Sequence, residues 1–403
     1  MERRSFLKSS LLASTAALSL GHARAAFRSR TPRSFTPAWA KTVSDFDAYI
    51  KAERVVGGSL YFVHDGEVLN AEHYGYADIA TGRKVDADTI YHWASITKTF
   101  TGIAFMQLRD RGLVSLDDPI VKYLPVLREV HDPYGTIDQI TLRQLLSHSS
   151  GFRNPTFPFA GGKPWQPLEP KEWSTIESMM PYTEIEFPPG SKYSYSNLGL
   201  SMVGRVVEII SGQHIDSYID KNILKPLGMR DSYFDMTPDF LVKHRSNSYI
   251  IENGKPEAQG LEVDTGATLG NGGLNASLPD FVKYTNFLLG LKDNGNYRAI
   301  LSRKTLQEMW VPRYPTDDIE GVNFREQMAM PFFVIDFKRM GRTTRYIGHT
   351  GSQAGYLAFF YIQPESRSAV IWVVNSRPKD NYRPMVYAER INIFNTLFPP
   401  FIT

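Results

Sequence analysis

Three short motifs place side chains capable of acyl-transfer chemistry at the ends of predicted structural elements. Ser95 and Lys98 are three residues apart at the start of a helix predicted over residues 96–111, so their Cβ atoms should lie about 5–6 Å apart on one face. A buried amine can lose its proton and accept the proton of a nearby hydroxyl, and the N-terminal end of a helix favours developing negative charge. The pair therefore indicates a nucleophilic serine beside a base, although a serine at this place can also be only a helix N-cap.

Two further motifs could complete such a site. Tyr195-Ser196-Asn197 precedes an amphipathic helix predicted over residues 198–211, and His349-Thr350-Gly351-Ser352 precedes a strand predicted from Tyr356. Taken singly, each motif also fits a structural role, as a capping Asn beside a packed Tyr and as a turn that holds a satisfied His. The sequence contains no Gly-x-Ser-x-Gly elbow, P-loop, Gly-x-Gly-x-x-Gly or His-Glu-x-x-His pattern. It therefore lacks the motifs of α/β-hydrolases, of nucleotide-binding proteins and of zinc peptidases.

Composition narrows the functional classes further. The 403 residues include no cysteine, which excludes disulfides, thiolate metal sites, iron–sulfur clusters and a cysteine nucleophile. The net charge of +3 equals that of residues 1–25, where four basic residues stand against one acidic residue. The remainder is neutral, which argues against a nucleic-acid or anionic-membrane partner. No cofactor or metal is expected, and the sequence does not indicate the oligomeric state.

The elements that must position these motifs are strands at both ends of the chain and helices between them. Asp65-Gly66 is a strong hairpin signal. Strands are predicted at residues 59–64, 68–76, 330–337, 344–348, 356–362 and 369–375, and helices at 96–111, 198–211, 279–289 and 382–397. This order predicts an α+β fold, with one antiparallel sheet made from both ends of the chain, flanked by helices, and a helical lobe inserted.

Residues 1–25 predict an export signal. Arg3-Arg4 is followed by Phe6-Leu7-Lys8, an uncharged run over residues 9–21 and the small-x-small pattern Ala23-Arg24-Ala25, which together resemble a twin-arginine signal. The apolar run is shorter than the about 20 residues of a membrane span, and an uncleaved helical tail is the alternative. Residues 26–40 are predicted as a linker or arm and residues 41–403 as one domain. The mature protein is expected to be periplasmic or secreted.

The order and context of the three motifs resemble the serine β-lactamase and penicillin-binding superfamily. The similarity is greatest to the branch with class C β-lactamases, D-Ala-D-Ala carboxypeptidases, D-aminopeptidases and related carboxylesterases. It covers nearly the whole mature chain and also includes residues 141–151, 188–190, 272–274 and 348–351. The resemblance implies a β-lactamase/transpeptidase-like fold and identifies residues 41–403 as the hydrolase domain.

The resemblance also implies a role for each motif residue. Ser95 would form the acyl-enzyme, and Lys98 and Tyr195 would share the role of base, with the first proton acceptor left open. The backbone N–H groups of Ser95 and Ser352 would form the oxyanion hole. Asn197 would orient the substrate and Lys98. The substrate-binding residues are expected to be Asn197, His349, Thr350, Gly351 and Ser352.

Two departures from the family pattern bear on the substrate. Tyr195-Ser196-Asn197 replaces the Ser-Asp-Asn motif of class A enzymes, so deacylation by a class A Glu is not expected. His349 stands where most β-lactamases have a Lys that binds the substrate carboxylate, and His is partly neutral at pH 7. His148 is interpreted as structural, and the segment 155–173, rich in Pro and aromatic residues, as a wall of the substrate cleft.

The sequence therefore predicts an exported serine hydrolase that cleaves an ester or amide. The expected substrate is a small molecule or a peptidoglycan-derived peptide, of the D-Ala or β-lactam-like carboxylate type. A small-molecule carboxylesterase and a non-catalytic cell-wall binding protein on the same scaffold are the alternatives.

Overall fold

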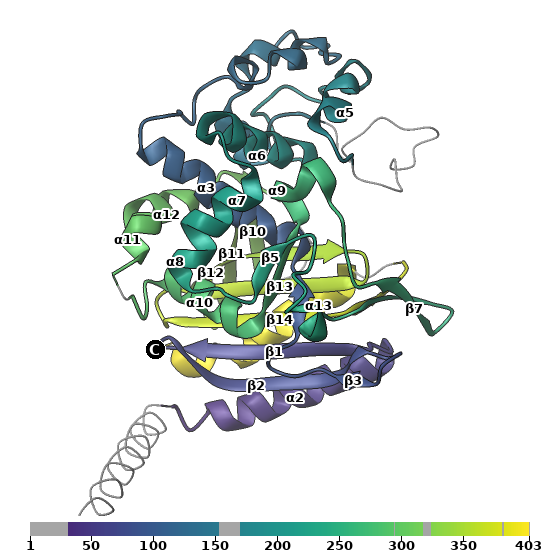
Figure 1. The fold of residues 1–403 in the computed structure, drawn as a ribbon. Helices are drawn as coiled ribbons and strands as arrows, with labels where there is room; N and C mark the ends of the chain where they lie inside the picture. Colours follow the sequence, from purple (N-terminus) through teal and green to yellow (C-terminus); the bar gives the residue numbers. More distant parts are fainter. Residues whose placement is uncertain (1–30, 153–169, 294, 317–323, 381–382, 403) are drawn as a thin grey trace, which may run out of the picture.

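Strands from both ends of the chain form the centre of the molecule (Figure 1). The computed structural model describes residues 31–152, 170–293, 295–316, 324–380 and 383–402. The predicted signal at residues 1–25 and all but the last four residues of the segment 155–173 lie outside these ranges. Within them, the antiparallel sheet has the order β3-β2-β1-β14-β13-β12-β11-β10-β9. The bounds are β1 Gly57–His64, β2 Glu67–Asp78, β3 Arg83–Lys84, β9 Tyr314–Pro315, β10 Phe324–Met328, β11 Phe333–Arg339, β12 Arg342–Gln353, β13 Tyr356–Gln363 and β14 Ser368–Val374.

The central strands β13 and β14 are buried along their whole length, because both faces of the sheet are covered there, and their sequences are almost continuously apolar. Along β14, alternate residues join two different cores, with Ile371 and Val373 on one face and Trp372 and Val374 on the other. The predicted hairpin at Asp65-Gly66 is confirmed between β1 and β2, and both residues have positive φ, 50° and 84°. This is the conformation of a type I′ turn, whose twist matches that of the flanking strands.

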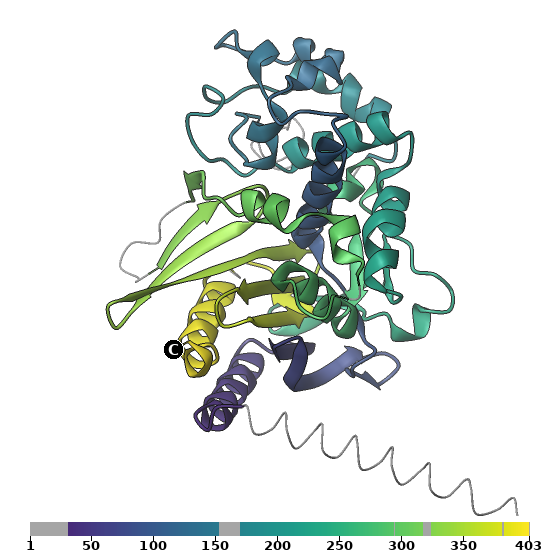
Figure 2. The same ribbon diagram turned by 90° about the vertical axis from the view of Figure 1, so that its left-hand side faces the viewer.

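Helices α2 (Phe35–Ala52) and α13 (Arg383–Thr396) lie side by side on one face of the sheet (Figure 2). Phe35 and Trp39 of α2 are buried in the core that these helices share with the sheet. Both residues fall in the segment 26–40 that the sequence predicts as a linker or arm. Residues 35–40 are therefore the first turns of a packed helix, and the segment before them lies mostly outside the described residues.

The opposite face of the sheet carries the helical lobe. Its longer helices are α3 (Thr97–Asp110), α6 (Asn197–Ser211) and α10 (Leu278–Leu289), each within two residues of its predicted bounds. The shorter helices are α4 Leu142–Leu146, α5 Trp173–Ser178, α7 Ile215–Ile219, α8 Lys225–Leu227, α9 Leu269–Gly272, α11 Tyr297–Ile300 and α12 Arg303–Met309. No helix in the described part of the chain is long and apolar enough to cross a membrane.

Two small sheets complete the fold, and the sequence did not predict them. They consist of β4 Ile90–His92, β5 Ser232–Phe234 and β8 Leu274–Ser277, and of β6 Ser248–Glu252, β7 Lys255–Gly260 and β15 Ser376–Pro378. Four of these strands, β4, β5, β8 and β15, have only three or four residues, which is too short for an alternating pattern to be recognised. Strand β4 of the first sheet leads directly into the segment that holds Ser95, so this sheet positions the candidate nucleophile.

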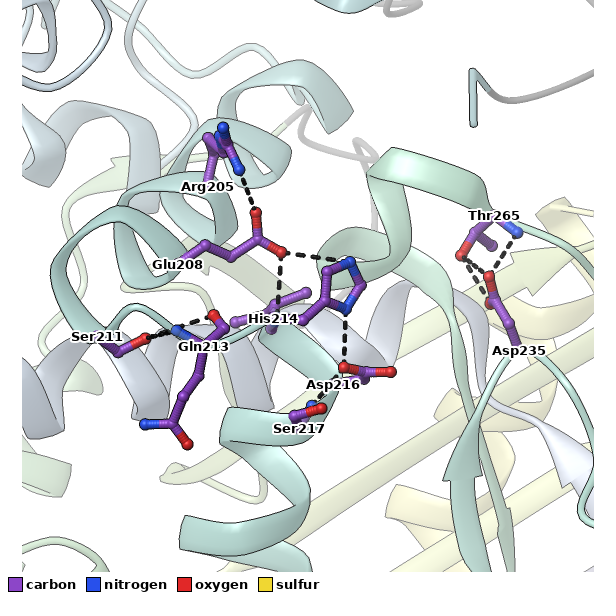
Figure 3. Close-up of polar contacts among 10 residues, drawn as sticks. Arg205, Glu208, Ser211, Gln213, His214, Asp216, Ser217, Asp235 and Thr265 are labelled. Carbon is purple, nitrogen blue, oxygen red and sulfur yellow. Dashed lines mark hydrogen bonds and ion pairs between the residues drawn. The ribbon is translucent and has the colours of Figure 1, made fainter. Parts of the chain in front are cut away.

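The junction between α6 and α7 is fixed by charged side chains (Figure 3). Glu208 accepts hydrogen bonds from Arg205 and from the Ile215 backbone N–H, and it lies 3.5 Å from His214. His214 in turn bonds Asp216, and this bond raises the pKa of the imidazole above its usual value. In the described part of the chain, no group of three or more His, Cys, Asp or Glu side chains could hold a metal ion. We therefore interpret these side chains as structural, because they connect the end of α6 to the start of α7.

The packing of α2 against α13 buries an acidic side chain. Glu389 on α13 is 7% exposed, and burial, followed by the charge of Asp45, raises the pKa of its carboxyl to about 7. The neighbouring Asp45 accepts hydrogen bonds from Lys41 and Asn392. In the folded protein Glu389 is therefore protonated below about pH 7, whereas the unfolded chain ionises near pH 4.5.

This difference predicts a fall in stability between pH 5 and pH 8. The unfolded state binds fewer protons than the folded state in this interval, so the free energy of unfolding decreases as the pH rises. Glu389→Gln cannot ionise, so its free energy of unfolding should not fall with pH in this way. Between pH 5 and pH 8 the variant should therefore become more stable than the parent by up to about 3 kcal/mol. Urea denaturation at pH 5 and pH 8 measures the free energy of unfolding of the parent and the variant. Glu257→Gln on the exposed strand β7 is the control. Equal pH slopes for Glu389→Gln and the parent would contradict the prediction.

Candidate active site

Ser95 lies in a tight turn between β4 and α3. The turn is the 3-10 segment Ala94–Ile96, which Ala94 enters with a positive φ of 47°, so the α-helix begins at Thr97 rather than at Ser95. Lys98 lies in the first turn of α3, three residues after Ser95, and its Nζ donates a hydrogen bond of 3.0 Å to Ser95 Oγ. Lys98 is fully buried whereas Ser95 is partly exposed. The hydroxyl is thus open to a substrate and the amine lies behind it.

Strand β8 anchors this turn from both sides. Before the turn, the Trp93 backbone N–H donates to the Leu274 carbonyl at 2.8 Å, and the Trp93 ring stacks on Phe281 at 3.9 Å. After the turn, Thr97 Oγ1 accepts the Leu274 N–H at 3.0 Å and donates to the Ala94 carbonyl at 2.6 Å. The serine is therefore held on a rigid segment, as precise acyl transfer requires.

Tyr195 and Asn197 flank the N-cap of α6. Ser196 is the cap, because its Oγ accepts the Gly199 backbone N–H at 3.1 Å. Lys98 Nζ lies 5.1 Å from the centre of the Tyr195 ring. The first two predicted motifs are therefore adjacent in space.

A polar chain through α9 links Asn197 to Lys98. Ser201 Oγ donates to the Asn197 carbonyl at 3.1 Å and accepts from Asn271 Nδ2 at 2.7 Å. The Asn271 carbonyl accepts from Lys98 Nζ at 2.8 Å. Sequence reasoning missed Asn271, for which the only signal was its place beside Gly272-Gly273 in the matched pattern.

The third motif lies on strand β12, so the alternative of a turn into a strand is wrong. His349, Thr350, Gly351 and Ser352 pair with Phe360, Phe359, Ala358 and Leu357 of β13, and the strand continues to Gln353. Gly351 passes very close to the segment before Ser95, because a Cβ built on it would lie 2.3 Å from the Trp93 carbonyl oxygen. This contact places the β12 backbone next to the serine. Thr350 and Ser352 are partly exposed there.

His349 is neutral in this site. The ring is fully buried against Phe333 at 4.8 Å, with the Tyr195 ring centre 6.5 Å away. Burial, followed by the charge of Lys98, lowers the pKa of His349 to about 3. Its Nδ1–H donates to the Thr350 carbonyl at 2.6 Å, so Nε2 carries the lone pair. His349 therefore does not provide the cation that a Lys would supply at this place.

The structure thus brings Ser95, Lys98, Tyr195, Asn197 and the His349–Ser352 motif to one location. The roles assigned to these residues remain predictions. His148 also lies at this location, stacked on Tyr195 at 4.3 Å, although it was interpreted as structural from the sequence.

Comparison with known proteins agrees with the fold and with the resemblance. Residues 40–391 match the family model described as Beta-lactamase. Esterase EstB of Burkholderia gladioli is 32% identical over 197 residues, which are 47% of this chain and 50% of that esterase. Protein flp of Staphylococcus aureus (strain MW2) is 27% identical over 202 residues, which are 50% of this chain and 39% of that protein. The match thus spans half or less of these relatives.

Two solved structures share the architecture. The octameric penicillin-binding protein homologue from Pyrococcus abyssi has a TM-score of 0.70 and 26% identity, covering 88% of this chain and 77% of that chain. A class C beta-lactamase has a TM-score of 0.70 and 17% identity, covering 89% of this chain and 96% of that chain, which shows similarity of fold alone. The predicted α+β fold of the β-lactamase/transpeptidase type is confirmed.

Proposed function

Because this chain belongs to the Beta-lactamase family, whose fold supports serine hydrolases, we propose that it hydrolyses an ester or amide through an acyl-enzyme on Ser95. The observation that carries the proposal is the 3.0 Å hydrogen bond between the buried Lys98 amine and the partly exposed Ser95 hydroxyl. A serine is a weak nucleophile unless a base adjoins it, and an amine placed so close can take its proton.

The proposed reaction has two halves. Ser95 Oγ attacks the substrate carbonyl carbon, and its proton passes to Lys98 Nζ or to the Tyr195 phenolate. The backbone N–H groups of Ser95 and Ser352 stabilise the resulting oxyanion. The carbon–oxygen or carbon–nitrogen bond then breaks, the leaving group takes the proton, and the acyl group stays on Ser95. A water molecule, deprotonated by the same base, releases the acid and restores the hydroxyl.

We further propose that the preferred substrates are small carboxylic esters without a carboxylate beside the scissile bond. A carboxylate on a β-lactam or on a D-Ala peptide needs a cation, and His349 is neutral because it is buried. Protonating this ring to bind an anion is unfavourable at neutral pH. The identity to Esterase EstB supports the same choice.

The test is a panel of three substrates with mass spectrometry of the protein. We expect p-nitrophenyl butyrate to be hydrolysed, the intact mass to rise by one butyryl group early in the reaction, and peptide mapping to locate that group on Ser95. Benzylpenicillin and a peptide ending in D-Ala-D-Ala should be turned over more slowly. Faster cleavage of either would overturn the proposed substrate but keep the acyl-enzyme. If none of the three substrates is turned over and none forms an adduct, the proposed function is overturned.

We also propose that the enzyme acts outside the cytoplasm. The support is the twin-arginine-like segment at residues 1–25. N-terminal sequencing of the protein from the periplasm or the medium checks this, with a start near Ala26 expected. A protein found only in the cytoplasm would contradict it.

A further inference from the structure

We infer that His148 is a positioning residue for Tyr195, an inference that rests on the serine-hydrolase function proposed above. His148 follows α4 and is fully buried. Its ring lies on the Tyr195 ring with centres 4.3 Å apart and planes 25° apart, which is a stacked arrangement. A ring packed on one face of the phenol restricts rotation of that phenol about its own axis.

The same residue also holds the backbone on both sides of Tyr195. The His148 carbonyl accepts the backbone N–H of Ser194 at 2.8 Å. His148 Nδ1 accepts the backbone N–H of Ser196 at 3.0 Å. Three contacts from one residue, two to the backbone and one to the ring, therefore fix where Tyr195 lies relative to Ser95 and Lys98.

His148 performs this task without adding charge. Because Nδ1 accepts a hydrogen bond, the proton of the neutral ring is on Nε2. Burial, followed by the charges of Lys98 and then of His349, holds the pKa of His148 well below its usual value. A protonated His148 ring would repel the Lys98 ammonium. A neutral ring does not, and the proton of Ser95 then passes to Lys98 or Tyr195 as proposed above. Within the described part of the chain Nε2 has no hydrogen-bond partner, so His148 acts through Nδ1 and its face.

The backbone at His148 is unusual for such a residue. Its φ is +52°, in the left-handed region that favours Gly and Asn. A residue kept in an unfavourable conformation points to a contact that requires it. Asn tolerates this conformation and carries an oxygen where His carries Nδ1, so His148→Asn can keep the bond to the Ser196 N–H while removing the stacked ring.

The experiment compares His148→Ala, His148→Asn and Ser149→Ala on p-nitrophenyl butyrate. Ser149 is the matched control, because it is fully buried in the same turn and its hydroxyl bonds Ser147 and the Gln144 carbonyl. We expect His148→Ala to lower kcat about 10- to 100-fold, as a misplaced catalytic group does, with KM nearly unchanged. His148→Asn should recover a substantial part of this loss, and Ser149→Ala should keep the parent kcat. An unchanged kcat in His148→Ala, or equal losses in all three variants, would overturn the inference.

A second measurement needs no turnover. With 3-fluorotyrosine at position 195, slow flipping of the stacked ring should give two fluorine resonances in the parent protein. His148→Ala should give one averaged resonance, since the ring is released. The same number of fluorine resonances in the parent protein and in His148→Ala would overturn the inference. These spectra do not depend on hydrolysis. They therefore test the positioning of Tyr195 separately from the proposed function, which fails only if the protein cleaves neither an ester nor an amide.

Discussion

Replacing Ser95 with Ala is expected to abolish ester hydrolysis and the acyl adduct together. The hydroxyl is the atom that forms the covalent bond in the proposed reaction, and the neighbouring amine has nothing to deprotonate without it. Loss of the nucleophile in a serine hydrolase lowers kcat on the order of 10⁴- to 10⁶-fold. Initial rates and intact mass with p-nitrophenyl butyrate measure both effects. Ser178→Ala, at an exposed position of α5, is the control that should keep full activity.

Lys98→Met provides an independent part of the same prediction. Met has nearly the same length and fills the buried space, but it cannot donate to Ser95 Oγ or to the Asn271 carbonyl. We expect a loss on the order of 10³-fold or more, and a double variant no worse than Ser95→Ala alone, because residues that act as a unit are not additive. Residual activity above about one tenth of the parent in either single variant would contradict the assignment of the pair.

Gly351→Ala is expected to give the second large effect, through the geometry of the site rather than its chemistry. The new Cβ would lie 2.3 Å from the Trp93 carbonyl oxygen and 3.2 Å from its carbon. These are backbone atoms, and Trp93 is pinned by its bond to Leu274 and its stacking on Phe281. Strand β12 or the Ser95 turn must therefore shift, and a displacement of about 1 Å at an active site costs on the order of 10²-fold in rate.

The matched control is Gly204→Ala within α6. A Cβ at Gly204 meets its nearest neighbours at 3.8 Å, which is ordinary contact, and Ala favours the helix by about 1 kcal/mol over Gly. We expect Gly204→Ala to keep the parent kcat/KM and to raise the thermal midpoint, whereas Gly351→Ala lowers both. Activity of Gly351→Ala within a few-fold of the parent would show that the close approach of β12 to Ser95 is not required.

The sequence by itself determined the parts of this protein that depend on near neighbours along the chain. Local sequence patterns predicted six strands of the large sheet, β1, β2, β11, β12, β13 and β14, and the helices α3, α6, α10 and α13. Asp65-Gly66 predicted the β1–β2 hairpin. The Ser95–Lys98 hydrogen bond follows from three-residue spacing in a helical turn. The motif order gave the family, which the match over residues 40–391 confirms.

Some elements left too weak a local signal to be predicted. Helix α2 begins inside a segment whose Arg, Ser and Pro content favours a linker, because its stability comes from packing Phe35 and Trp39 on a distant sheet. The strands β4, β5 and β8 are held by pairing with one another rather than by any pattern of their own. In both cases the stabilising partner is far away in the sequence.

Only the tertiary structure decided the character of the site. The Asn271 carbonyl reaches Lys98 because α9 packs against α3 and α6. His349 is neutral because folding buries its ring against Phe333 and near Tyr195, and the identity of a residue does not reveal its burial. His148 contacts Tyr195 through a stacked ring that no spacing rule predicts. Local spacing determines which groups can react, and long-range packing sets their distances and charges, because desolvation and contact depend on residues brought together from the whole chain.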